Sequence, residues 1–228
     1  KIDIIFEEKI MKYIIVQLSI MLAIIMVSGC GESTTPSENK TQTINPLLQG
    51  NRWNYHSVWY KTPNNSTTIK EEKKYSIEVV GKEIIKGKEY ALLQYSDQDK
   101  PSLAAYNDNT GYWQNSLDNP ILMAAFPCKT GDTWVRDTIP RTDEQGNKIG
   151  TFTTRMTVIS TNTKRNVYNK DYICYHYQET YTELNENTKI SDTQIDYFYA
   201  VNIGLVEMVM TDKGKEIRTL ELMSASLQ

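Results

Sequence analysis

Apolar and polar residues alternate along several short stretches of the chain, which is typical of β-strands with one buried face. The clearest stretches are 74–81, 90–95, 152–159 and 172–177. A helical period is nearly missing after residue 45, and only 116–126, SLDNPILMAAF, predicts a helical turn or two. The pattern therefore predicts an all-β, antiparallel domain of about ten strands.

Turn residues separate these stretches. Residues 203–223 predict a closing hairpin with its turn at Asp212-Lys-Gly214, because Asp and Gly accept the positive φ of tight hairpin turns. A second hairpin tip is predicted at 143–147, DEQGN.

The chain also resembles itself. Gly50-Asn-Arg-Trp53 matches Gly131-Asp-Thr-Trp134, segment 75–95 parallels 155–177 with Gly87 opposite Asn169, and Tyr106/Gly111 matches Tyr199/Gly204. The matches occur in the same order in both halves, so the sequence predicts two pseudo-repeats, approximately 47–115 and 128–208. The halves would form one continuous curved sheet or a sandwich of two sheets.

An apolar run at the start predicts export. Residues 14–27 are almost continuously apolar, but a membrane-spanning helix needs about 20 residues. Met11 and Lys12 supply the start and the charge of a signal peptide at 11–29. Residues 1–10 carry three acidic side chains and fit no such segment, which indicates an upstream extension.

The end of the apolar run, Val27-Ser28-Gly29-Cys30, has the pattern of a bacterial lipobox. Such a signal is cleaved between Gly29 and Cys30, and the Cys30 thiol carries the lipid. Two or three acyl chains anchor a protein stably to a membrane. We therefore expect a lipid-anchored, extracytoplasmic protein, at the outer membrane if the cell has two membranes, because Gly31 is not Asp.

Residues 31–45 are polar and lack aromatic side chains, so they predict a flexible tether behind the lipidated cysteine. The remaining chain, 46–228, is long enough for a single β-domain. The formal net charge of −3 does not suggest binding to nucleic acid.

The chain resembles a loosely defined group of uncharacterised bacterial surface lipoproteins. The resemblance rests on the lipobox, the tether and the phrases PLLQGNRWNY (46–55), FPCKTGDTW (126–134) and YFYAVNIGLVEM (197–208). It implies a β-domain opened by Gly-Asn-x-Trp. It brings no catalytic residue, because the group has no established activity.

Cys128 and Cys174 remain once Cys30 is assigned to the lipid. Outside the cytoplasm they could form a disulfide, but Cys174 lies in an alternating strand and two buried free thiols are the alternative. Cys174 and His176 lack a third, orienting group and do not indicate a nucleophile.

The histidines and acidic loops indicate no metal and no cofactor. His56 and His176 are the two histidines of the chain, whereas a zinc site needs three or four ligands. The segment 106–118, YNDNTGYWQNSLD, is slightly like a calcium loop, but its Gly is misplaced and YAVNIG in the second half has no acid. Turn geometry explains it better.

Four tryptophans divide into two kinds. Trp53 and Trp134 occupy matching positions, so we expect them in the core, whereas Trp59 and Trp113 are candidates for an exposed binding face. With no catalytic motif, the sequence favours a non-enzymatic binding or scaffold module of the cell envelope. Alternatives are a hydrolase of envelope polysaccharide that uses dispersed carboxylates, and a carrier that holds an apolar ligand in the hollow of the sheet. Its partner would be an envelope protein, a glycan or a small apolar ligand.

Overall fold

The fold is a single sheet of twelve antiparallel strands in a computed structural model that describes residues 42–62, 65–116, 119–142, 148–183 and 189–228. The strands are β1 (Arg52–Thr62), β2 (Asn65–Ile85), β3 (Lys88–Tyr95), β4 (Leu103–Asp108), β5 (Gly111–Ser116), β6 (Asn119–Ala125), β7 (Thr133–Thr142), β8 (Lys148–Val167), β9 (Lys170–Glu183), β10 (Lys189–Ala200), β11 (Gly204–Asp212) and β12 (Lys215–Ser226). Among the described residues, none forms a helix long and apolar enough to span a membrane.

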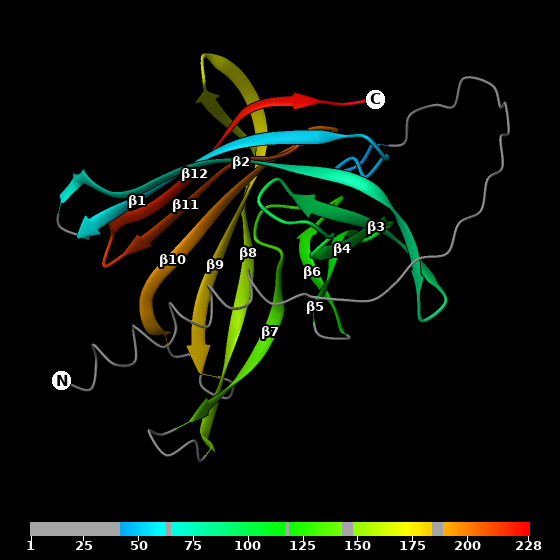
Figure 1. The fold of residues 1–228 in the computed structure, drawn as a ribbon. Coiled ribbons are helices and arrows are strands. Elements are labelled where there is room, and N and C mark those ends of the chain that lie inside the picture. The colour runs from blue at the N-terminus through cyan, green and yellow to red at the C-terminus, as the bar shows by residue number, and fades with distance from the viewer. Residues whose placement is uncertain (1–41, 63–64, 117–118, 143–147, 184–188) are drawn as a thin grey trace, which may run out of the picture.

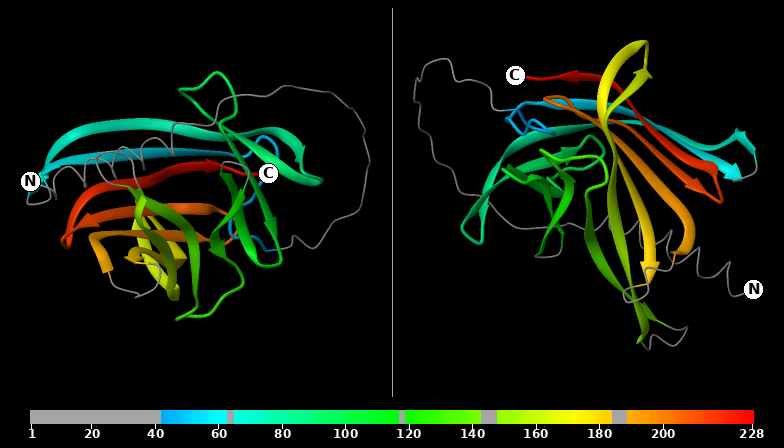
Figure 2. Two further views of the ribbon diagram at one scale, coloured as in Figure 1. Left: turned by 90° about the horizontal axis from the view of Figure 1, so that it is seen from below. Right: turned by 180° about the vertical axis from the view of Figure 1, so that it is seen from behind.

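Strand order makes the first and last strands neighbours in the middle of the sheet. The order is β6-β5-β4-β3-β2-β1-β12-β11-β10-β9-β8-β7, so β6 and β7 are the two edges. The sheet curls until these edges approach each other (Figures 1 and 2). There the Trp134 indole donates to the Leu122 carbonyl at 2.9 Å. The all-β prediction is confirmed, with twelve strands rather than about ten and a curved, nearly closed sheet rather than a sandwich.

The predicted helical turn within 116–126 is wrong. Residues 119–125 form β6, which pairs with β5 from Gly111↔Ala125 to Ser116↔Asn119. Pro120 is tolerated because β6 is an edge strand, where one row of backbone groups needs no ladder partner. The short apolar run ILMAA therefore supplies a strand face, which periodicity alone cannot distinguish from a helical turn.

The predicted turns are confirmed where the structure describes them. Lys213 and Gly214 both have positive φ between β11 and β12. The pairs Lys86-Gly87 and Tyr168-Asn169 form matching two-residue turns, also with positive φ throughout. The predicted tip at 143–147 lies outside the described residues, between the paired strands β7 and β8.

The two halves begin in the same way. Gly50 donates its backbone N–H to Val79 at 2.8 Å, and Val79 donates back to Asn51 at 2.9 Å. Gly131, Val158 and Asp132 repeat this arrangement, with both distances at 2.8 Å. Both glycines have positive φ, 85° and 92°, which residues with a side chain adopt only under strain.

Further along, the halves differ. Asp108 pairs with Gly111 across a two-residue turn, whereas Ala200 pairs with Gly204 across three residues. Tyr106 consequently faces the outside of the sheet with Trp113, whereas Tyr199 faces the inside, contrary to the expectation that they are equivalent. Strands β9 and β10 have 14 and 12 residues against 8 and 6 in β3 and β4, so the second half has a longer sheet.

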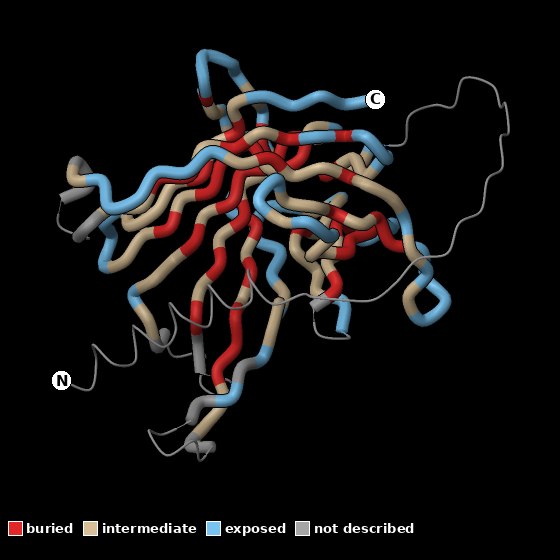
Figure 3. The backbone as a smooth tube through the Cα atoms, viewed as in Figure 1, coloured by how far each residue is buried: buried red, intermediate tan, exposed pale blue. Residues whose placement is uncertain are grey.

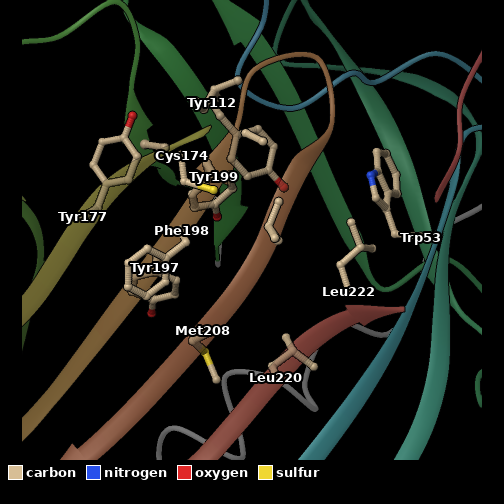
Figure 4. Packing of buried hydrophobic residues seen from close by; sticks show 14 of the residues in the cluster. Trp53, Tyr112, Cys174, Tyr177, Tyr197, Phe198, Tyr199, Met208, Leu220 and Leu222 are labelled. Atoms are coloured by element: carbon tan, nitrogen blue, oxygen red, sulfur yellow. The ribbon is translucent and has the colours of Figure 1, made fainter. Parts of the chain in front are cut away.

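The core lies on the inner, concave face of the curved sheet (Figures 3 and 4). Burial alternates along the strands because successive side chains point to opposite faces. Trp53 is 2% exposed, and its indole donates to the Ile203 carbonyl at 2.5 Å. Trp134 packs against the same core, so both tryptophans lie where the sequence placed them.

Candidate functional site

Tyrosines dominate the inner face around the centre of the sheet. Register places Tyr55 opposite Tyr75 and Tyr177 opposite Tyr197, all pointing inward. Ring centroids are 6.0 Å apart for Tyr55 and Tyr75, 5.7 Å for Tyr75 and Tyr95, and 6.3 Å for Tyr112 and Tyr199. We call Tyr55, Tyr75, Tyr95, Tyr112, Tyr197 and Tyr199 the tyrosine cluster. Figure 4 labels Tyr112, Tyr197 and Tyr199 among the buried residues of the core.

The cluster presents neutral phenols. Burial raises the pKa of Tyr112 to about 12 and raises the pKa of Tyr55, Tyr95, Tyr197 and Tyr199 further above the ordinary value. The Tyr55 hydroxyl donates to the Leu205 carbonyl at 3.0 Å, and Tyr112 accepts from Gln114 at 2.8 Å. The hydroxyls of Tyr75, Tyr95 and Tyr199 have no hydrogen-bond partner within the described ranges. These three can therefore donate to a ligand or to water.

A buried ion pair lies beside the cluster. Arg136 on β7 contacts Glu179 on β9 through Nη1 and Oε2, and the Tyr197 hydroxyl donates to the same oxygen at 2.8 Å. Burial lowers the pKa of Arg136, but the charge of Glu179 and the phenols of Tyr197 and Tyr181 together raise it above the ordinary value. Glu179 is 1% exposed, yet its second oxygen, like Nε of Arg136, has no partner among the described residues. Such atoms ordinarily bind water or a ligand.

A second arginine faces the cluster from the other side. Arg218 on β12 lies between Met210 and Trp59 in register, and its Cζ is 4.6 Å from the centre of the Trp59 ring. Its Nε donates to the Ser57 hydroxyl at 3.3 Å. Trp59, a sequence candidate for an exposed binding face, thus points inward and is partly buried. Ser57, Trp59, Tyr75, Tyr95 and Arg218 form what we call the arginine site.

The other candidate tryptophan lies on the outer face. Trp113 stacks on Tyr106 with ring centroids 5.8 Å apart, and Nζ of Lys88 lies 3.1 Å from the centre of the Tyr106 ring. The Trp113 indole donates to Asp108 at 3.0 Å. Tyr106 is 8% exposed, so this patch is a small second core and the structure does not bring Trp59 and Trp113 together.

Asp108, in the segment that resembles a calcium loop, caps a turn. One of its oxygens accepts from the Thr110 backbone at 2.9 Å, the Thr110 hydroxyl at 2.6 Å and the Gly111 backbone at 3.2 Å. These bonds use the acid as a turn residue, as the sequence indicated. No group of three or more potential metal-binding side chains occurs in the part of the chain that the structure describes.

The tip of the β8–β9 hairpin folds over the outer face. Tyr168 hydrogen-bonds Nδ1 of His56 at 2.7 Å, while Nε2 of His56 contacts Glu72 at 2.7 Å. Arg165 pairs with Glu207 and lies 4.4 Å over the Phe198 ring. The tip therefore fixes His56 and covers the outer face of β10–β12 and β1.

The second histidine is held on the same face. His176 contacts Asp196 at 2.7 Å and stacks on Phe198 at 4.5 Å. Both histidines lie in strands, His56 in β1 and His176 in β9, and each has one carboxylate partner.

The two cysteines are free thiols, so the disulfide alternative is corrected. Cys174 is fully buried on the outer face beneath the hairpin tip, and burial raises its pKa to about 12. Cys128 lies inside, 3.7 Å from the Tyr177 hydroxyl, and burial raises its pKa. Opposite faces of one sheet keep the thiols apart. Gly29 and Cys30, the predicted cleavage and lipidation site, lie outside the described residues.

Sequence reasoning did not find Arg136, Glu179 or Arg218. A signal was nevertheless present: Arg218 precedes Leu220 and Leu222 at even spacing, and Glu179 follows Tyr177 in the same way. A strand places such residues on one face, so charged side chains there are directed inward.

No protein-family model and no curated protein matches the chain. Three solved structures resemble it. One, from Bacteroides fragilis, is described as an exported protein with a YmcC-like fold; identity is 9%, coverage 82% of this chain and 100% of that one, and the TM-score 0.47. A lipoprotein from Parabacteroides distasonis has 13% identity, the same coverage and a TM-score of 0.49. The lipoprotein YmcC from Escherichia coli has 14% identity, coverage of 79% and 87%, and a TM-score of 0.38.

Proposed function

We propose that this protein is a lipid-anchored, non-enzymatic binding module of the bacterial cell envelope, which holds its ligand on the inner face of the sheet. The observation that carries the proposal is the unmet hydrogen-bonding capacity of that face. Burying polar groups without partners costs free energy, so a ligand that supplies partners is favoured there. The same groups disfavour a purely apolar ligand, which would leave Arg218 and the phenols unsatisfied.

The lipobox supports the proposed location at the cell envelope, and the fold supports an orientation of the domain relative to the membrane. Residues 42–49 pack against one end of the curved sheet: Thr43 and Asn202 exchange hydrogen bonds of 3.0 and 2.7 Å, and Ile44 is 1% exposed. The predicted lipidation site, Cys30, precedes this end in the sequence. Trp59 lies seven residues along β1 from Arg52, toward the other end. The arginine site is therefore directed away from the membrane.

The reactive side chains of the described sheet support binding rather than catalysis. The Cys174 thiol is buried and protonated at neutral pH, because its pKa is raised. Glu179 is bound to Arg136, and both histidines lie on the outer face, away from the tyrosine cluster. No acid and base converge on one position of the inner face within the described residues, as the hydrolase alternative would require.

We also infer that the two halves arose by duplication. The matching hydrogen bonds around Gly50 and Gly131 and the six-strand meander of each half support this. In this view, extension of β9 and β10 in the second half created the wall that carries Glu179.

A ligand panel tests the proposed function. The purified protein is screened by thermal shift against envelope glycans, peptides and anionic metabolites. Each ligand that binds is recovered, and its mass is determined by mass spectrometry. We expect at least one ligand to raise the melting temperature and to be recovered unchanged. A ligand returned as cleavage products would establish the hydrolase alternative, and a panel without any binding would contradict the proposal.

A further inference from the structure

We propose that Arg218 binds an oxyanion, a carboxylate or phosphate group of the ligand, at the arginine site. The inference rests on the proposed function and names the chemistry that the inner face recognises. It follows from how the guanidinium is positioned, from what its neighbours lack, and from how the other inner-face cations are paired.

The contacts of Arg218 fix its guanidinium but leave much of it free. The Trp59 ring, whose centre is 4.6 Å from Cζ, and the single bond from Nε to Ser57 position the guanidinium, and this bond uses one of its five N–H donors. Within the described ranges, the terminal Nη groups have no hydrogen-bond partner and no carboxylate lies within 4.0 Å. A rigid planar fork of this kind matches two oxygens of a carboxylate or phosphate.

Two other inner-face cations show what a structural pairing looks like in this sheet. Lys73, which faces Ser57 in register, contacts Asp97, and Arg136 contacts Glu179. Lys73 and Arg136 are thus paired within the fold, whereas Arg218 remains available to a ligand.

The surroundings of Arg218 favour an arriving anion. Burial lowers the pKa of Arg218, which shows that water does not fully solvate the charge. The phenols of Tyr75 and Tyr95 partly offset the effect of burial on the pKa of Arg218, and their hydroxyls are without partners among the described residues. An oxyanion would thus receive the guanidinium fork and phenolic donors together. The carboxylate of Glu71, which lies opposite Trp59 and is exposed at the rim, raises the pKa of Arg218 by less than burial lowers it.

A purely structural stack of Arg218 on Trp59 makes a different prediction about stability. If Arg218 served the fold, replacing it would lower the melting temperature. If Arg218 is instead a binding residue without a carboxylate partner, Arg218→Met removes a desolvated charge and keeps an apolar side chain of similar length. The ligand-free variant should then melt at the same temperature as the wild type or at a higher one. Functional sites carry such a cost because the ligand supplies the missing partner.

Titration of the purified protein with sodium acetate and with inorganic phosphate tests the proposal directly. The readout is the Nε–H resonance of Arg218 in a ¹H–¹⁵N spectrum, assigned by its loss in Arg218→Gln and recorded at constant ionic strength with chloride as the reference. The melting temperature is followed in the same series. Arg52→Gln is the matched control, because Arg52 is an exposed arginine of β1 that pairs with Glu78 at 3.8 Å.

We expect a saturable shift of this resonance and a rise in melting temperature that Arg218→Gln abolishes and Arg52→Gln retains. Arg218→Lys should weaken binding about tenfold, since a lysine keeps the charge but loses the fork. A response to acetate alone assigns a carboxylate, a response to phosphate alone assigns a phosphate, and a response to both assigns the shared oxyanion chemistry.

A shift no larger than that in chloride, or thermal stabilisation that survives in Arg218→Gln, would overturn the inference. A panel ligand that binds wild type and Arg218→Gln equally would overturn it while leaving the proposed binding function intact. The proposed function fails if the whole panel fails to bind, or if a bound ligand is returned as cleavage products.

Discussion

A Cβ atom on Gly111 would lie 2.1 Å from the carbonyl oxygen of Ala124. Gly111 opens β5 with φ +147°, and Ala124 belongs to the edge strand β6. The close approach seats the edge strand against the β4–β5 turn, where the Phe126 N–H donates to the Thr110 carbonyl at 2.9 Å. The contact is with backbone, so no side-chain rotation can relieve it.

Gly111→Ala should therefore destabilise the protein strongly, by about 2–4 kcal/mol, through the clash and the unfavourable φ together. Gly131→Ala is the matched control, because φ is +92° there but nothing lies within 4 Å of the added atom. We expect that variant to lose about 1 kcal/mol. Urea unfolding of both variants measures the difference, and equal losses would contradict a steric role for Gly111.

The ion pair of Arg136 and Glu179 should behave as a unit. Removing one partner leaves a buried charge without compensation, so Glu179→Gln and Arg136→Met should each cost about 3–5 kcal/mol. The double variant should cost clearly less than the sum, because both charges are then gone. A double-mutant cycle by urea unfolding measures the coupling, and additive losses would show that the two side chains act independently.

The sequence was sufficient for the strands and turns of this fold because their signals are local. Alternation at 74–81 and 172–177 lies within β2 and β9, and Asp212-Lys-Gly214 is the turn between β11 and β12. The strand β6 was missed because ILMAA has no alternation, and an edge strand needs none. The order of strands, with β1 beside β12, depends on contacts between the ends of the chain that no local pattern encodes.

The candidate site was less predictable, for a related reason. The direction of Trp59 depends on its register with Arg218, which lies far along the chain. A bulge beside Trp59 in the β1–β2 pairing and another near Arg136 in the β7–β8 pairing change which face a residue occupies, and bulges have no strong sequence signal. Free thiols could not be told from a disulfide until the faces of Cys128 and Cys174 were known.

The two thiols should differ in reactivity. In the native protein at pH 8, a thiol-exchange reagent should modify Cys128, which is partly exposed, far faster than Cys174, which is fully buried with a pKa of about 12. Both should react at once in denaturant. With Cys30 replaced by Ser throughout, reaction of Cys128→Ser with the reagent measures Cys174 alone. Fast native labelling of that variant, or a Cys128–Cys174 disulfide formed under mild oxidation when both are present, would contradict the buried position of Cys174.

Stability should fall in acid partly through Asp196. Burial raises the pKa of Asp196, but hydrogen bonds from His176, Gln194 and Gln178 lower it more, so the folded value lies below the ordinary one. A lowered pKa stabilises the fold above the unfolded value of about 3.9, and the contribution disappears as the pH falls through the folded value. Asp196→Asn should flatten the loss of unfolding free energy below about pH 4, measured by urea unfolding at several pH values. An unchanged acid slope would exclude the contribution of this carboxylate.

The proposed lipid anchor and membrane location of the protein can be tested at Cys30. Cys30→Ser removes the thiol that would accept the lipid, so the precursor should stay uncleaved and should incorporate no labelled fatty acid. Ser28→Ala is the matched control, because a small residue before Gly29 preserves the lipobox pattern and should leave processing intact. Fractionation should then find the wild type and the control with the membrane, in a mature form shortened by the signal peptide. If Cys30→Ser still carried labelled fatty acid, or if the wild type carried none, the lipid anchor would be wrong. The proposed orientation of the arginine site would then lose its basis, because it depends on a tether that begins at Cys30.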